Sequence, residues 1–205
     1  RKYFSVLSKK FNLLILDSIN NESVSDIINK KNFKKIIIPY EVGNTAKDNK
    51  NILVGLKYLT LNKNLFLFKN RYKNKTRSFN IVVCVGGSDP YFLNRYFLKL
   101  ISHYKKRKVT KILIIFGPLI NKKEKKMLMN DIKKLNISYI ENPKNIYNII
   151  CRSSVVITST GIIKYELAKI GMPTVMITHN IQSLKNNQGF AKKNTGITCT
   201  WFVII

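Results

Sequence analysis

The sequence contains few cysteines, few histidines and few acidic residues. Its 205 residues include three cysteines, two histidines and ten aspartates and glutamates, against 37 lysines and arginines. The cysteines (Cys84, Cys151 and Cys199) lie far apart and show neither metal-ligand nor redox spacing, which argues against a disulfide framework and a zinc site. We therefore expect reduced thiols, no metal, no cofactor and a cytoplasmic location.

Long apolar runs are also lacking. No apolar stretch reaches the roughly 18 residues that a transmembrane helix needs, and no signal peptide is visible. A membrane span is therefore not expected, whereas peripheral contact with a membrane surface is an alternative that the sequence allows. The sequence begins without Met and stops at Trp-Phe-Val-Ile-Ile, so we interpret it as a fragment of a longer protein. Its apolar content of 45% is sufficient for a hydrophobic core.

Positive charge is in excess, with a formal net charge of +27. A charge of this size suggests nucleic acid or an anionic membrane as a binding partner. The lysines are scattered over every expected helix, however, with no arginine-rich block and no interleaved aromatic residues to stack on bases. We therefore expect no nucleic-acid partner. The positive field would still attract an anionic small molecule.

Short runs rich in Ile, Val and Leu alternate with helix-like segments. We expect strands at 12–17, 36–38, 81–85, 112–116, 137–140, 155–157 and 175–177. We expect helices at 22–31, 90–102, 122–134, 145–151, 183–194 and in the segment that ends at Gly171. This alternation predicts an α/β fold with parallel sheets and helices on both faces. Ligands of such sheets bind at the carboxyl ends of the strands, and every motif described below lies at such an end.

The most informative segment is 155–171, a strand followed by a turn of small residues and a helix. On this helix Glu166 shares the i, i+3, i+4 face with Ile163 and Leu167. A carboxylate on the inward face needs hydrogen-bond donors, because burying an unpaired charge is costly. The hydroxyls of a ribose or sugar would supply them, and the turn offers backbone N–H groups to a phosphate. The alternative is that Glu166 caps a neighbour or extends to water.

Three further loops follow expected strands. Residues 86–90 (Gly-Gly-Ser-Asp-Pro) form a turn in which Asp89 fits a helix N-cap and Pro90 the first helical position. No Gly-Lys-Ser or Gly-Lys-Thr follows, so this is not a Walker phosphate loop. The loops at 141–146 and 178–180 carry polar residues that could contact a ligand or simply form turns.

Four segments resemble a known group of enzymes. Ser-Thr-Gly-x4-Glu followed by Gly-x-Pro-Thr, at 159–174, is similar to the donor-binding motif of GT-B nucleotide-sugar enzymes. These include the N-acetylglucosamine transferase that makes lipid II. The resemblance is strongest to the UDP-sugar hydrolase of pseudaminic-acid synthesis and its spore-coat-polysaccharide relatives. Segments 85–90, 53–61 and 13–18 agree with it and stand in the family's order.

The resemblance implies a GT-B-type α/β protein with Rossmann-like parallel sheets. Residues 1–43 would be the end of an N-terminal Rossmann-like domain, 44–78 a linker and interdomain segment, and 79–205 the C-terminal nucleotide-sugar-binding domain. It also implies a site for a UDP-sugar. The residues expected in this site are Gly87, Ser88, Asn142, Ile146, Ser159, Thr160, Gly161, Glu166, His179 and Asn180.

For function, the resemblance implies an enzyme that releases UDP from a nucleotide-linked sugar in surface-glycan or nonulosonic-acid biosynthesis. Glycosyl transfer from a UDP-sugar is the alternative within the enzyme class. A nucleotide-sugar-binding module without turnover is the alternative outside it. The hydrolase family's general base lies in a Gly-His segment of the N-terminal domain, and no such segment is present. We therefore assign no catalytic residue, no sugar and no oligomeric state from the sequence.

Overall fold

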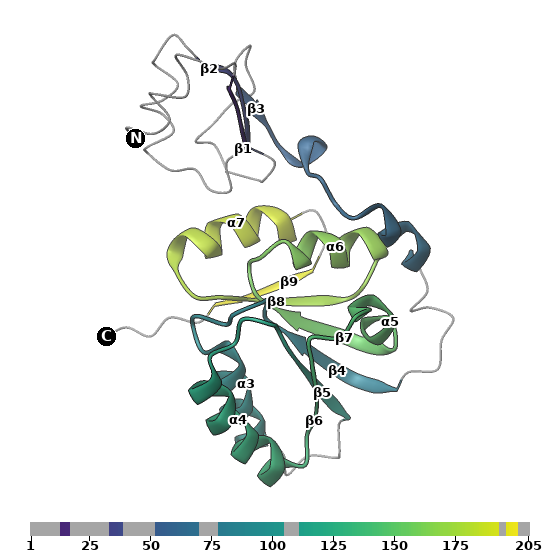
Figure 1. Cartoon of the computed structure of the whole chain (residues 1–205), viewed down its shortest axis with the longest axis vertical. Coiled ribbons are helices and arrows are strands. Elements are labelled where there is room, and N and C mark those ends of the chain that lie inside the picture. The colour runs from purple at the N-terminus through teal and green to yellow at the C-terminus, as the bar shows by residue number, and fades with distance from the viewer. Residues whose placement is uncertain are drawn as a thin grey trace. The chain divides into compact units, whose positions relative to one another are not determined.

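The protein forms two compact units, Arg1–Leu61 and Asn62–Ile205 (Figure 1). The computed structural model describes residues 13–16, 33–38, 52–69, 78–104, 111–192 and 196–200. The helix expected at 22–31 lies outside these residues.

The first unit contains a parallel three-stranded sheet in the order β1-β2-β3. Its strands are β1 (Leu13–Leu16), β2 (Phe33–Ile38) and β3 (Ile52–Val54), and a short 3₁₀ helix, η1 (Leu56–Tyr58), follows. The strands expected at 12–17 and 36–38 are thus confirmed. The third strand lies in the stretch interpreted as a linker, where its three residues are too few to produce a visible alternation.

The second unit is built on a six-stranded sheet in the order β6-β5-β4-β7-β8-β9, and every neighbouring pair is parallel. Its strands are β4 (Phe79–Cys84), β5 (Ile112–Phe116), β6 (Ser138–Glu141), β7 (Ser153–Thr158), β8 (Thr174–Thr178) and β9 (Ile197–Thr200). This confirms the predicted parallel α/β architecture. Because all six strands run the same way, the loops that follow β4, β6, β7 and β8 share one edge of the sheet.

Helices cover both faces of this sheet. They are α3 (Leu93–Tyr104), α4 (Lys122–Leu135), α5 (Ile146–Ile150), α6 (Ile163–Ile170) and α7 (Ile181–Ala191). Figure 1 shows α3 and α4 on one side of the sheet and α6 and α7 on the other. On the first side, Phe97, Leu98 and Leu128 pack in one cluster with Val83 and Ile114 of the central strands. On the second side, α5 packs on β7, and α6 and α7 pack on β8.

Capping residues decide where the helices begin. Helix α3 starts at Leu93 and not at the predicted Pro90, because the Asp89 carboxylate accepts hydrogen bonds from the backbone N–H groups of Leu93 (2.8 Å) and Asn94 (2.9 Å). Helix α7 starts at Ile181, two residues before the prediction. There the Asn180 side chain accepts from the N–H of Ser183 and the Ser183 hydroxyl accepts from the N–H of Asn180, a capping box.

A 3₁₀ segment before β4 belongs to the second unit. This segment, η2 (Lys63–Phe68), packs against α5 and α6. Leu65 is 1% exposed and Phe68 is also buried, with the Phe68 ring 5.6 Å from the ring of Tyr147. The apolar residues of this segment therefore add to the hydrophobic interior of the unit.

No helix in the described part of the chain is both long enough and apolar enough to cross a membrane.

Candidate functional site

Two loops meet at the carboxyl edge of the second sheet. The Thr158 hydroxyl donates to the carbonyl oxygen of Cys84 (2.7 Å), and the Ser159 hydroxyl donates to that of Val85 (2.8 Å). These bonds join the ends of the two central strands, β4 and β7. The glycine loop at 86–88 therefore lies beside the turn at 159–161, as the strand pattern predicted.

The glycine loop is held from its other side by the loop after β5. The N–H of Leu119 donates to the carbonyl oxygen of Gly87 (2.9 Å). A Cβ atom on Gly117 would lie only 2.4 Å from the carbonyl oxygens of Gly86 and Gly87, so the close approach requires glycine at 117. Gly87 and Ser88 are both exposed. The sequence reasoning missed Gly117, whose only signal was a Gly-Pro pair at a strand end.

The turn at 159–161 opens helix α6, which has no side-chain cap. An N-terminus of this kind leaves backbone donors and the positive end of the helix dipole for an anion. Gly161 is exposed and Thr160 is half-buried. The predicted residues Ser159, Thr160 and Gly161 thus lie together where a phosphate could bind.

Glu166 lies on α6 as the periodicity predicted. Ile163 and Leu167 are buried, whereas Glu166 is half-buried. The hydroxyl of Tyr147, on α5, donates a hydrogen bond to Glu166, and burial together with this carboxylate raises the pKa of Tyr147 above its usual range. Among the described residues the Tyr147 hydroxyl donates to this carboxylate, whose two oxygens have further acceptor sites for a ligand. Tyr147 was not foreseen, because no sequence spacing relates a residue on α5 to one on α6.

The loop after β6 reaches the same edge of the sheet. Asn142 is exposed, has a φ of 37°, and donates its N–H to the carbonyl oxygen of Phe116 (2.9 Å). Ile146 is the first residue of α5 and is half-buried, next to Tyr147 in the chain. Ile146 therefore lies next to the residue that bonds Glu166, whereas Asn142 is bonded to the end of β5.

The loop after β8 carries the last two predicted residues. The side-chain oxygen of Asn180 accepts from the N–H of Ser183 (2.7 Å), so this amide serves to cap α7. The His179 ring stacks on the ring of Tyr91, with 3.5 Å between the ring centroids and 19° between the planes. Burial lowers the pKa of His179, so the ring is neutral at pH 7. Tyr91 was not singled out in the sequence, where it follows Pro90 without any periodic signal.

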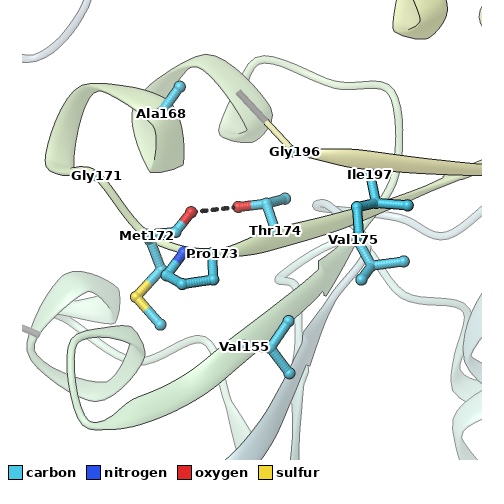
Figure 2. A pocket seen from close by; sticks show the side chains of 9 residues that line it. All are labelled: Val155, Ala168, Gly171, Met172, Pro173, Thr174, Val175, Gly196 and Ile197. Atoms are coloured by element: carbon cyan, nitrogen blue, oxygen red, sulfur yellow. Dashed lines mark hydrogen bonds between the residues drawn. The ribbon is translucent and has the colours of Figure 1, made fainter. Parts of the chain in front are cut away.

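A hollow of about 420 Å³ lies at the opposite edge of the sheet, near the beginnings of β8 and β9 (Figure 2). It is lined by Val155, Ala168, Gly171, Met172, Pro173, Thr174, Val175, Gly196 and Ile197. None of these side chains is charged, and the Thr174 hydroxyl already donates to the carbonyl oxygen of Met172 (2.8 Å). The lining therefore offers no binding group for an anion, and we do not place the site there.

The described residues include no group of three His, Cys, Asp or Glu side chains that could hold a metal ion. Cys84 and Cys151 are buried thiols that form no disulfide, and burial raises the pKa of the Cys84 thiol to about 11. A thiol with this pKa is almost entirely protonated at pH 7 and is a poor nucleophile. The chemistry of the edge therefore rests on hydroxyl, carboxylate, imidazole and backbone groups.

Comparisons with known proteins agree with this architecture. Residues 80–202 match the family described as "Glycosyltransferase family 28 C-terminal domain". The crystal structure of MurG from Acinetobacter baumannii superposes with a TM-score of 0.60 at 12% identity, over 93% of this chain. The chain spans about half of that structure, 54% of its length. No curated protein matches the sequence.

The structural likeness at this identity concerns the fold alone, and it confirms the GT-B-type α/β architecture. The family match runs from the second residue of β4 to beyond β9, so it includes the glycine loop and the loop after β8. On this basis the chain belongs to glycosyltransferase family 28, of which it contains the C-terminal domain.

Proposed function

We propose that this chain is the donor-binding part of an enzyme that transfers a sugar from a UDP-sugar. The observation that carries the proposal is the position of Glu166 in the first turn of α6, a helix whose uncapped start follows the turn bonded to the end of β4. A carboxylate accepts through both of its oxygens, which suits the two hydroxyls of a ribose. The neighbouring helix start suits a diphosphate.

The donor would lie along the edge of the sheet. Its ribose would bind Glu166, joining or replacing the Tyr147 hydroxyl. Its phosphates would bind the backbone at 86–88 and 159–161, and its uracil would lie toward Asn142 and Ile146. Buried, reduced cysteines fit an enzyme of the cytoplasm.

Transfer is the preferred reaction because the matched family is one of glycosyltransferases. Hydrolysis, the first expectation from the sequence, is the second candidate, and only the resemblance of segments 85–90 and 53–61 to the hydrolase group supports it. Incubation of the complete enzyme with a UDP-sugar separates the two reactions. Release of free sugar without any acceptor would favour hydrolysis, whereas UDP release that depends on an added acceptor would favour transfer.

The nucleotide assignment is tested at Glu166. The Glu166→Ala substitution should weaken UDP binding by about tenfold to a hundredfold, because a charge-assisted hydrogen bond contributes about 1.5–3 kcal/mol. The Glu166→Gln substitution should restore little, since the single acceptor oxygen of the amide would have to serve both the Tyr147 hydroxyl and the ribose. Isothermal titration calorimetry with UDP measures both effects, and thermal melting checks that the variants fold.

The control is Asp131→Ala, which removes the same charge. Asp131 lies on α4, on the face of the sheet opposite to α6 (Figure 1), so its loss should leave UDP affinity within about twofold of the wild type. Equal UDP affinities for wild type and the folded Glu166→Ala variant would reduce Glu166 to a structural partner of Tyr147.

A further inference from the structure

An aromatic pair joins two loops that do not follow neighbouring strands. Tyr91 belongs to the turn after β4 and His179 to the loop after β8, and β7 lies between these strands. Neighbouring strands are about 4.8 Å apart, so the two loops start roughly 10 Å from each other. The stacked rings therefore meet across the end of β7, next to the turn at 159–161 that opens α6.

The backbone that presents Tyr91 is strained. Asp89 has a φ of 49° and Phe92 a φ of 54°, and the left-handed region is unfavourable for a bulky residue such as phenylalanine. The Asp89 carboxylate fixes this turn through its bonds to Leu93 and Asn94. Despite the strain, the turn leaves Tyr91 53% exposed. Strained backbone that holds an exposed aromatic side chain next to a ligand site indicates a binding role.

His179 contributes an unused polar atom to the pair. Its Nδ1 is buried and has no hydrogen-bond partner among the described residues, while its backbone N–H donates to the Ser183 hydroxyl (3.2 Å). A buried polar atom without a partner is rare in folded proteins. This atom is covered while the rings are stacked, so the surface open to a sugar is the exposed ring of Tyr91.

The pair offers a flat aromatic surface, the exposed ring of Tyr91 with His179 stacked behind it. A pyranose ring presents C–H groups on its face and hydroxyls on its rim, so it suits a surface of this kind better than a phosphate does. With ribose at Glu166 and phosphates at 86–88 and 159–161, the sugar of a nucleotide-sugar would extend beyond the phosphates, where the pair lies.

We propose that Tyr91, stacked on His179, is the sugar-contacting residue of the donor site and makes the protein bind a UDP-sugar more tightly than UDP. This inference rests on the proposed function. It adds a residue that neither the motifs nor the periodicity had indicated.

The test compares UDP with UDP-N-acetylglucosamine and UDP-glucose by calorimetry on the full 205-residue chain. The Tyr91→Ala substitution should weaken binding of at least one UDP-sugar by about threefold to tenfold, the range expected for loss of one aromatic contact, and should leave UDP affinity unchanged. The Tyr91→Phe substitution keeps the ring and should retain the UDP-sugar affinity. Tyr139→Ala serves as the control, since Tyr139 is an exposed tyrosine of β6 that packs near Phe116.

Each outcome bears on one of the two proposals. If the wild type does not bind UDP, the proposed function fails and the inference fails with it. If UDP binds normally but the folded Tyr91→Ala variant binds both UDP-sugars as the wild type does, only the inference is overturned. Tighter binding of UDP by the variant would also overturn the inference. Tyr91 and His179 would then block the phosphate site instead of contacting a sugar.

Discussion

At the scale of single residues, the most unusual group is the carboxylate of Glu124, on the first turn of α4. Its side chain is 4% exposed, and its Oε1 has no hydrogen-bond partner among the described residues. Burial raises the pKa of Glu124 to about 7 and the nearby Asp89 carboxylate adds to this effect, although Arg95 opposes it. Asp89 is also the residue that fixes the turn carrying Tyr91, so the protonation of Glu124 acts next to the proposed donor site.

This raised pKa predicts a pH-dependent stability. Between about pH 4.5 and pH 7 the folded protein keeps a proton on Glu124 that the unfolded chain releases. The free energy of unfolding should therefore fall as the pH rises through this window and be constant above it. The Glu124→Gln variant lacks this titrating group. The difference between its free energy of unfolding and that of the wild type should therefore rise, in favour of the variant, by on the order of 3 kcal/mol across this window.

Urea unfolding at pH 5 and pH 8 measures this difference. Glu141→Gln is the control, because it removes a carboxyl group from an exposed side chain and not from a buried one. Parallel stability curves for the wild type and Glu124→Gln would show that Glu124 titrates as an ordinary carboxyl group.

At the scale of elements, helix α6 is buried on more than one face. The periodicity predicted its apolar stripe, but Lys164 and Tyr165 are buried as well. The Lys164 ammonium donates to the side-chain oxygen of Asn187 on α7 (2.8 Å) and lies over the rings of Tyr165 (4.8 Å) and Phe190 (5.3 Å). These contacts join α6 to α7, and they hold in place the helix that carries Glu166.

We predict that Lys164 stabilises the helix pair chiefly through packing and its hydrogen bond. The Lys164→Ala substitution should lower the free energy of unfolding by about 2–4 kcal/mol, since it leaves a cavity and removes a donor from a buried amide oxygen. The Lys164→Met substitution keeps most of the volume and should cost about 1 kcal/mol, because burying the charge is itself unfavourable. Urea unfolding is the measurement.

The control on the same helix is Lys169→Ala. Lys169 is exposed and its ammonium lies over the Phe66 ring (4.5 Å), so its loss should change stability by no more than about 0.5 kcal/mol. If Lys164→Ala were as mild as Lys169→Ala, the buried contacts of Lys164 would contribute nothing to the packing of α6 on α7.

At the scale of the whole molecule, the start of the C-terminal domain has two candidate positions. The sequence placed its start at 79, whereas the compact unit begins at Asn62 and includes η2. We predict that a fragment of residues 62–205 is more stable than one of residues 79–205 by about 3–5 kcal/mol, because the shorter fragment exposes the surface that Leu65 and Phe68 cover. Urea unfolding of both fragments, with circular dichroism to confirm their fold, decides between the boundaries. Equal stabilities would favour the start at 79.

Most strands were predictable because a buried strand of a parallel sheet is a local signal, a short run of β-branched and apolar residues. The short strands β3 and β9 were not expected. Helix ends were predicted less well. Asp89 was recognised as a capping residue, but its oxygens accept from Leu93 and Asn94 and so delay the helix by three residues. Such a choice depends on the strained turn between them, which the residue types alone do not specify.

The sequence by itself determined the α/β class, the parallel strands, the edge at which the motifs gather and the inward side of α6, because each depends on residues a few positions apart. Only the tertiary structure decided that Tyr147 donates to Glu166, that Gly117 closes on the glycine loop, and that Tyr91 stacks on His179. Each of these contacts joins two loops or helices from distant parts of the chain. Their meeting is set by the strand order of the sheet, in which β4 and β7 are neighbours although two strands separate them in sequence. No local periodicity encodes such an order, so the partners of the site residues emerge only when the sheet is assembled.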